Sequence, residues 1–280
     1  ILALNGDLHR FNGTSWNRET LNGHAPGALS GASIFGFNDN DFWIIDGSIM
    51  YHWNGTAVIE TRLEKTGVWN YPHDGVIHSA WGTSSNAMFF VGDSGTILHF
   101  DGTHWTKMST PTKENLYVIR GSSDTDIWAT GYNPNTAESE VLHFDGTTWT
   151  EDKLSTSGTA YSYGIGDVVE FDSAGHKVLA AAGSTVFRRT DDGPWWMDGT
   201  VPNGDHIGIG FAAQSPNDLF VAGGWGVVAH WSGKSWKRYD QFYEPDNPVY
   251  GAGGASYRGN TLCIVGVKNG TSWVLLGQRQ

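Results

Sequence analysis

The sequence predicts an all-β protein in which one four-stranded unit is repeated along the chain. The first observation is a recurring turn between an aromatic residue and a later Trp, as in Phe100-Asp101-Gly102-Thr103-His104-Trp105. The glycines of these turns stand at positions 13, 55, 102, 146, 193 and 233, which is a spacing of 40 to 47 residues. A period in the forties is typical of propeller blades with four strands each.

The second observation is a short apolar segment that ends in Gly upstream of each turn. Two examples are 89–92 (Phe-Phe-Val-Gly) and 220–223 (Phe-Val-Ala-Gly). Such segments are apolar at nearly every position, as expected for strands whose two faces are both covered. Clusters of Ser, Asn and Asp precede them and predict hairpin turns. Segments of small residues come before those turns, and they suit innermost strands, where the blades are crowded around the axis. No helical period of useful length occurs.

These observations predict a single β-propeller domain over residues 1–280, with seven blades preferred and six as the alternative. The expected blades cover 1–20, 29–63, 75–110, 115–153, 160–199, 205–241 and 248–280. The first and last blades each lack one strand, and we expect them to meet where the propeller closes. Residues 269–273 repeat the letters of residues 12–16. They follow an apolar strand so closely that we interpret them as a turn between second and third strands.

Composition limits the function classes. The net charge is −12 at pH 7, which argues against nucleic-acid binding and suits neutral ligands, cations or basic partners. The one cysteine, Cys263, excludes an intrachain disulfide, and its apolar segment predicts a buried thiol. No stretch approaches the ~20 apolar residues of a membrane span, so we expect no membrane insertion. Abundant Gly, Trp, Asn and Thr with little Lys favours a secreted or cell-surface location.

The stretch from Trp81 to Trp105 resembles the repeats of bacterial secreted or surface β-propellers. These are related in style to Asp-box (neuraminidase-like) repeats and to the propellers of photosystem II assembly factors. The resemblance covers almost the whole chain and implies the fold. It implies no single function, because propellers host lectins, hydrolases, lyases and scaffolds alike. The chain departs from the Asp-box pattern, since no Ser-x-Asp-x-Gly-x-Thr-Trp occurs.

Residues that repeat from unit to unit are interpreted as structural, because they solve the same packing problem each time. We expect the histidines of the third strands to hydrogen-bond a neighbouring blade or turn, since equivalent positions lie too far apart to share one metal ion. We expect the fourth-strand tryptophans to pack between blades, with sugar sites at the rim as the alternative. These residues are His52, His99, His143 and His230, and Trp16, Trp105, Trp149, Trp196 and Trp236.

Function is sought in the segments that do not repeat. In propellers the connections between blades and the turns between second and third strands share one face, which is the usual ligand face. Aromatic rings mixed with polar groups there suit a saccharide, although such rings also pin long loops to the scaffold. The candidate ligand-binding residues are Trp69, Tyr71, His73, Asp74, Tyr163, Asp205, His206, Trp225, Tyr243 and Asp246.

The preferred hypothesis is therefore a secreted or cell-surface binding module with a carbohydrate ligand. One alternative is a protein–protein interaction scaffold. Another is a polysaccharide lyase or glycoside hydrolase acting at the axial mouth, where Tyr71 with His73, or Tyr163 with His206, would supply acid and base. We assign no catalytic residue, metal or cofactor, because no nucleophile triad, phosphate-binding Gly loop or Cys/His metal spacing occurs. The ligand and the oligomeric state stay open.

Overall fold

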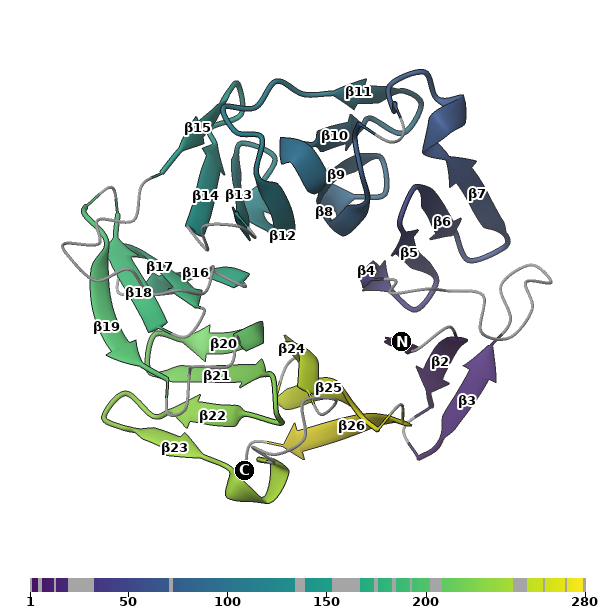
Figure 1. Cartoon of the computed structure of the whole chain (residues 1–280). Helices are drawn as coiled ribbons and strands as arrows, with labels where there is room; N and C mark the ends of the chain where they lie inside the picture. Colours follow the sequence, from purple (N-terminus) through teal and green to yellow (C-terminus); the bar gives the residue numbers. More distant parts are fainter. Residues whose placement is uncertain are drawn as a thin grey trace. The chain divides into compact units, whose positions relative to one another are not determined.

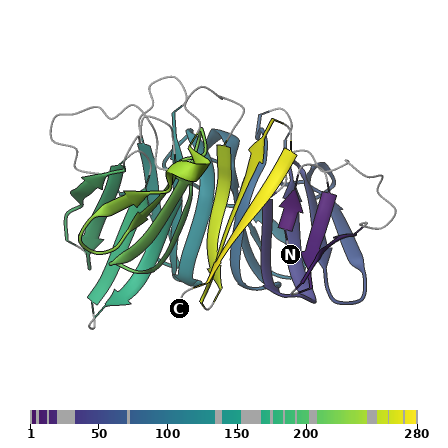
Figure 2. The same ribbon diagram turned by 90° about the horizontal axis from the view of Figure 1, so that it is seen from below.

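The computed structural model describes residues 2–4, 7–12, 14–19, 33–70, 73–133, 139–152, 167–173, 176–182, 185–191, 193–201, 208–243, 251–258, 260–269 and 271–278. The chain divides into two compact units. The first comprises residues 1–129 and 142–151, and the second comprises residues 130–141 and 152–280. Both consist of antiparallel sheets in which consecutive strands are hydrogen-bonded neighbours (Figures 1 and 2).

The first unit holds one three-stranded sheet and three four-stranded sheets, and the tip of the last sheet's middle hairpin belongs to the second unit. The strands of the first two sheets are β1 (Leu2–Leu4), β2 (Asp7–Phe11) and β3 (Trp16–Glu19), followed by β4 (Ser33–Asn38), β5 (Asp41–Asp46), β6 (Ile49–Trp53) and β7 (Val58–Arg62). The next two sheets comprise β8 (Ile77–Ser84), β9 (Ala87–Gly92), β10 (Ile97–Phe100) and β11 (Trp105–Lys107), then β12 (Asn115–Ser123), β13 (Asp126–Tyr132), β14 (Ser139–Phe144) and β15 (Trp149–Glu151). Two 3-10 turns, η1 (Leu63–Lys65) and η2 (Asp93–Gly95), follow β7 and β9.

The second unit holds two four-stranded sheets and one three-stranded sheet. Their strands are β16 (Asp167–Ser173), β17 (His176–Ala182), β18 (Thr185–Thr190) and β19 (Trp196–Thr200), then β20 (Gly208–Ser215), β21 (Asp218–Gly223), β22 (Val228–Trp231) and β23 (Trp236–Arg238), and last β24 (Gly251–Arg258), β25 (Thr261–Lys268) and β26 (Thr271–Gln278). A 3-10 turn, η3 (Asp240–Phe242), follows β23. No helix among the described residues is long and apolar enough to cross a membrane.

The expectation of seven blades, or six, is wrong. Across the described ranges five sheets have four strands and form five blades, whereas β1–β3 and β24–β26 each have three. The same sequence pattern of turns and short strands occurs in the three-stranded sheets and in the four-stranded sheets. Counting this pattern in the sequence therefore gives more units than there are complete blades. The all-β class is confirmed, and the turn at residues 268–271 does join the second and third strands of its sheet.

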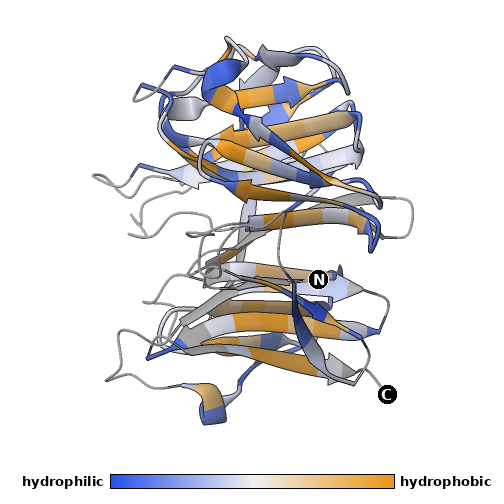
Figure 3. Cartoon of the chain, turned by 90° about the vertical axis from the view of Figure 1, so that its right-hand side faces the viewer, coloured by the Kyte–Doolittle hydropathy of each residue, from blue (hydrophilic) through white to orange (hydrophobic). Residues whose placement is uncertain are grey.

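Four second strands are largely buried on both faces, which explains their unbroken apolar sequences: β5, β9, β13 and β21. Alternate side chains of a strand point to opposite faces. Phe89 and Val91 of β9 therefore belong to one hydrophobic cluster, while Met88 and Phe90 belong to another. Orange hydrophobic bands along the middle strands in Figure 3 show the same distribution. Each such strand thus supports the two sheets that flank it.

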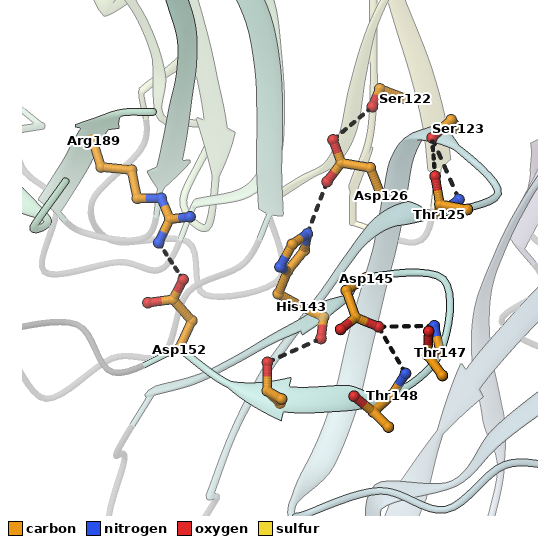
Figure 4. Close-up of polar contacts among 11 residues, drawn as sticks. Ser122, Ser123, Thr125, Asp126, His143, Asp145, Thr147, Thr148, Asp152 and Arg189 are labelled. Carbon is orange, nitrogen blue, oxygen red and sulfur yellow. Dashed lines mark hydrogen bonds and ion pairs between the residues drawn. The ribbon is translucent and has the colours of Figure 1, made fainter. Parts of the chain in front are cut away.

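The third-strand histidines are structural, as expected, but their partners lie within their own sheets. His52 Nε2 lies 2.9 Å from the carboxylate of Asp41, at the start of the adjacent strand, and the imidazole stacks on Trp43. His143 pairs in the same way with Asp126, as Figure 4 shows, and His230 pairs with Asp218. In the β8–β11 sheet an alanine begins the second strand, and the His99 ring packs on the Phe89 ring.

The predicted turn between third and fourth strands is present, and its carboxylate or amide side chain holds it. One oxygen of Asp101 accepts the backbone N–H groups of Thr103 and His104, at 2.8 and 2.7 Å. Those N–H groups hold the pKa of Asp101 below its ordinary value. Gly102 follows with φ +92°, and a Cβ there would lie 2.8 Å from the side chain of Asn86. Figure 4 shows the equivalent turn at Asp145.

Fourth-strand tryptophans pack on the preceding sheet where the structure describes both partners. The Trp105 ring lies 6.3 Å from Trp43 of β5 and 4.9 Å from Phe90, which confirms its predicted role. For Trp196 that prediction is wrong, because its side chain is 44% exposed. Trp195 is buried instead, and its indole N–H donates to Asp152, which also forms an ion pair with Arg189 (Figure 4).

Candidate functional site

The connection after η1 carries four of the predicted ligand residues, and the three that the structure describes each have a different place. Trp69 is 6% exposed and packs in the hydrophobic core of the first unit, so it anchors the loop. The carboxylate of Asp74 is buried, accepts the backbone N–H of Asn70 at 2.7 Å and pairs with Lys107. His73 is exposed. Two of the three residues therefore hold the loop, and one reaches solvent.

Five other predicted ligand residues lie outside the described residues. They are Tyr71, Tyr163, Asp205, His206 and Asp246. Both acid–base pairs of the lyase hypothesis include at least one of these positions, so that hypothesis stays a prediction.

A polar cluster adjoins this loop, and we call it the His78 cluster: His78, Asp93, Ser94, Asn115 and Tyr117. The Nε2 atom of His78 lies 2.7 Å from one carboxylate oxygen of Asp93. The His78 ring contacts the ring of Tyr117, with centroids 4.8 Å apart. Asn115 donates its amide N–H to the Tyr117 hydroxyl at 3.3 Å and accepts the backbone N–H of Ser94 at 3.0 Å. The cluster is thus joined by three hydrogen bonds and one contact between rings.

The turn Asp93–Gly95 that carries part of this cluster has an uncommon backbone. Ser94 has φ +56° and ψ 33°, which is a left-handed backbone conformation that costs free energy for residues other than glycine. Gly95 follows with φ +67°, and a Cβ there would lie 2.2 Å from the carbonyl oxygen of Thr112. The Gly95 N–H donates to the carbonyl of Glu114 at 2.8 Å. The turn is therefore fixed against the connection that leads into β12.

The predicted loop and the His78 cluster are in contact. The second carboxylate oxygen of Asp93 accepts the backbone N–H of Val76 at 3.0 Å. The Asp93 N–H donates back to the Val76 carbonyl at 2.9 Å. A Cβ at Gly75 would come within 2.3 Å of the Asp93 Cβ, so the backbones approach as closely as glycine allows. The segment after Asp74 is therefore tied to Asp93 by two hydrogen bonds, and the chain passes close to it at Gly75.

The chemistry of the cluster suits recognition of a polar ligand. The side chains of His78 and Asp93 are 28% and 23% exposed, so each is held in place and still reaches solvent. Fixed hydrogen-bonding groups beside an aromatic ring give a site orientation and specificity. Within the described residues, no group of three or more His, Cys, Asp or Glu side chains could hold a metal ion.

Sequence reasoning missed three members of this cluster: His78, Asn115 and Tyr117. The turn Asp93-Ser94-Gly95 is the exception, because the sequence places it between a second and a third strand, on the expected ligand face. Tyr117 stands on a first strand whose counterparts carry mainly small residues. The hydrogen bonds between His78 and Asp93 and between Ser94 and Asn115 span 15 and 21 positions of the chain, which no local pattern reports.

The second unit repeats the same turn at Trp225, another predicted ligand residue. The N–H of Gly223 donates to the Val227 carbonyl at 2.8 Å, and the N–H of Val227 donates to the Gly224 carbonyl at 3.1 Å. Trp225 has φ +54°, which is costly for a bulky residue, and its side chain is half-buried. Glycines on either side make this conformation accessible.

Tyr243, the last predicted residue that the structure describes, packs beneath a cation. The guanidinium of Arg238 lies 4.2 Å from the Tyr243 ring centroid, and its Nε donates to Asp240 at 2.6 Å. The Tyr243 ring also contacts the core of the β20–β23 sheet. These contacts make Tyr243 a residue that fixes the connection after β23.

A pocket of about 460 Å³ lies in the second unit, between the sheets β20–β23 and β24–β26. Sequence reasoning did not predict it. Its walls are mainly aromatic and aliphatic, with amide, hydroxyl and one carboxylate group at the edges. The lining residues include Phe220, His230, Tyr239, Tyr257, Leu275 and Gly277.

Comparison with known proteins shows the fold. No family model matches the sequence, and a search of curated proteins gives no match. Among solved structures, YCF48, a photosystem II assembly factor, bound to D1 peptide aligns with a TM-score of 0.68 and 16% identity. That alignment covers 100% of this chain and 88% of that chain. YCF48 from Cyanidioschyzon merolae aligns at TM-score 0.64 and 14% identity, over 94% of this chain and 85% of that chain.

A WD40 domain, that of Neurospora crassa Pan2, aligns at TM-score 0.62 and 13% identity. The alignment covers 99% of this chain and 84% of that chain. At these identities the matches establish a β-propeller fold. They confirm the resemblance to photosystem II assembly-factor propellers at the level of fold, while the bacterial, secreted and Asp-box parts of the resemblance stay predictions.

Proposed function

We propose that this protein is an interaction scaffold that binds peptide segments of other proteins, and that the His78 cluster with the adjoining loop forms one contact surface. The observation that carries the proposal is the alignment of the whole chain with a propeller that was solved bound to a peptide. The similarity to a WD40 domain also points to protein–protein interaction, which is one of the alternatives from the sequence. The proposal replaces carbohydrate as the first-choice ligand.

The chemistry of the His78 cluster supports a peptide ligand. A peptide offers backbone donors and acceptors at regular intervals, and His78, Asp93 and Tyr117 present partners for both. The carbohydrate hypothesis depended on exposed aromatic faces. Of its two tryptophans, Trp69 is buried in a core and Trp225 is half-buried. No observation favours a sugar over a peptide.

The test uses a displayed library of random peptides, selected against the purified protein. We expect enrichment of peptides that bind saturably, with affinities weakened about fivefold or more by His73→Ala and by Tyr117→Phe, because one hydrogen bond contributes about 1 kcal/mol. The matched control is His104→Ala, since that imidazole is 77% exposed in a turn between third and fourth strands.

Two results would contradict the proposal. One is the absence of any saturable peptide after selection. The other is an equal loss of affinity in the His104→Ala control. A glycan array run in parallel tests the earlier hypothesis, and saturable sugar binding that is lost on Tyr117→Phe would restore it.

A further inference from the structure

The last strand of the second unit, β26, ends its sheet but has the sequence of an interior strand. It pairs with β25 over eight consecutive residues with no bulge. Its sequence, Thr-Ser-Trp-Val-Leu-Leu-Gly-Gln, contains no charged residue and no proline. Natural edge strands are blunted by charges, prolines or bulges, because an open edge pairs with other chains. The outermost strands of the five complete blades each carry at least one charged residue.

The pocket lies beside this edge strand. Leu275 and Gly277 of β26 share one face of the strand and line the pocket. Across from them stand Phe220 and Tyr239, from the β20–β23 sheet. Leu276, on the other face, is 42% exposed. An apolar strand edge and an aromatic cavity therefore adjoin each other.

The first unit shows what fills the equivalent space in a complete blade. There the fourth strand β11 pairs with β10 and places Trp105 against Trp43 and Phe90. Trp43 stacks on His52 at a centroid distance of 4.4 Å, and Phe220 stacks on His230 at 4.2 Å, so Phe220 is the counterpart of Trp43. Among the described strands of the β24–β26 sheet there is no fourth, and the pocket occupies the place of the Trp105 indole.

Charge favours a basic occupant. In the first unit Lys107, two residues after Trp105, pairs with Asp74 in the connection that follows η1. In the second unit η3 opens the connection after β23 with Asp240, whose side chain is 75% exposed and forms an ion pair with Arg238. The residues lining the pocket include a carboxylate, Asp218, and no lysine or arginine. A net charge of −12 adds long-range attraction for a cationic peptide.

We propose that the β26 edge and the adjoining pocket bind an extended peptide of a partner protein, which pairs with β26 as a fourth strand. The peptide inserts an aromatic side chain into the pocket and carries a basic residue two positions later. Such strand addition takes affinity from main-chain hydrogen bonds and specificity from side-chain pockets. This surface belongs to the second unit and involves no residue of the His78 cluster, so the inference goes beyond the proposed function and can fail independently of it.

The probe is a labelled, end-capped peptide, Thr-His-Trp-Thr-Lys-Met-Ser, which has the sequence of residues 103–109. Its binding to the intact chain is followed by fluorescence polarisation. We expect saturable binding that weakens at least tenfold on Trp105→Ala in the peptide and about threefold to tenfold on Lys107→Glu, because buried aromatic side chains dominate such interfaces. Two further peptides carry N-methyl groups on alternate residues, and strand pairing tolerates only one of the two patterns.

A variant that fills the pocket provides the second arm. A Cβ at Gly277 would meet the Leu262 Cβ at 3.7 Å, an ordinary contact, so Gly277→Leu directs a side chain toward the cavity without a backbone clash. We expect this variant to lose peptide binding at least tenfold. The control is Ile59→Thr, an equally apolar and 49% exposed position in the first unit, which should bind normally.

Several outcomes would overturn the inference. These are no saturable binding of the tryptophan peptide, equal binding of the Trp105→Ala peptide, or equal tolerance of both N-methyl patterns; each uses the unmodified protein and so avoids any folding defect. A concentration-dependent dimer that Gly277→Leu abolishes would assign the edge to a second copy of this chain instead. Failure here with intact binding at the His78 cluster leaves the proposed function standing.

Discussion

The imidazole of His78 and the carboxylate of Asp93 meet at 2.7 Å, although one residue stands near the start of β8 and the other follows the end of β9. The same carboxylate also accepts the backbone N–H of Val76. Asp93 therefore fixes both the histidine side chain and the entry of the chain into its sheet. A single side chain links the shape of the loop to the chemistry of the cluster.

Replacement of Asp93 by alanine is expected to lower the free energy of unfolding by about 2 kcal/mol, because it leaves the Val76 N–H and the His78 imidazole without their acceptor. Urea unfolding followed by tryptophan fluorescence measures this change. Asp93→Asn keeps one acceptor oxygen and should cost less than half as much. Equal losses in the two variants would show that the carboxylate charge, and not hydrogen bonding, carries the effect.

The two adjacent residues of the turn after β9 are expected to respond oppositely to substitution. Ser94→Gly should stabilise the protein by about 0.5 kcal/mol. Glycine removes the cost of the left-handed conformation, roughly 1 kcal/mol, but it loses more conformational entropy on folding than serine does, which offsets part of this gain. Gly95→Ala should destabilise it by about 2 kcal/mol or more, because a Cβ would strike the Thr112 carbonyl at a positive φ. Thermal and urea unfolding of both variants decide the matter, and effects of the same sign would contradict the backbone argument.

Acid is expected to weaken the turns between third and fourth strands. Backbone N–H groups lower the pKa of Asp101 and of Asp145 in the folded protein relative to their ordinary value of 3.8. A depressed folded-state pKa contributes stability that is present above the unfolded-state pKa and is lost as the pH falls through the folded-state pKa. The contribution of these two groups should therefore disappear below about pH 4.

The measurement is the urea midpoint between pH 6 and pH 2 in the native protein and in the double variant Asp101→Asn, Asp145→Asn. Asparagine makes the same turn at Asn54, so the variant should fold. We expect it to lose less stability over this range than the native protein. Parallel pH profiles for the two proteins would refute the assignment.

Cys263 is expected to react slowly with thiol reagents. Burial raises the pKa of its thiol, and the thiolate is the reactive form. At pH 7 labelling by a disulfide reagent should be at least tenfold slower in the native protein than in urea-unfolded protein. Comparable rates in the two states would place the thiol in a more open environment than the structure gives it.

The sequence predicts the local chemistry of this fold well, for a physical reason. The turn at Asp101 and Gly102 depends on a carboxylate that accepts two nearby N–H groups and on a glycine at positive φ, and both are properties of neighbouring residues. The continuous apolar run of β9 likewise reports burial on both faces. These features are determined within about ten residues of the chain.

What the sequence misses depends on register and on pairing between distant segments. Trp195 and Trp196 are adjacent, yet Trp195 is buried and Trp196 is 44% exposed, and the repeated turn motif does not distinguish between them. The blade count fails for a related reason, because three strands give the same local pattern as four. The His78 cluster was missed because its members come from two sheets.

The division of β9 between two cores has a consequence for how the first unit comes apart. Phe89 and Val91 share a cluster with Leu116 and Ile127 of the following sheet, whereas Met88 and Phe90 share one with Trp43 and Met50 of the preceding sheet. Unfolding of β9 would therefore expose hydrophobic side chains of both neighbouring sheets at the same time. Melting of the first unit should therefore spread from sheet to sheet as a single cooperative event, with no sheet that peels away and leaves its neighbours intact.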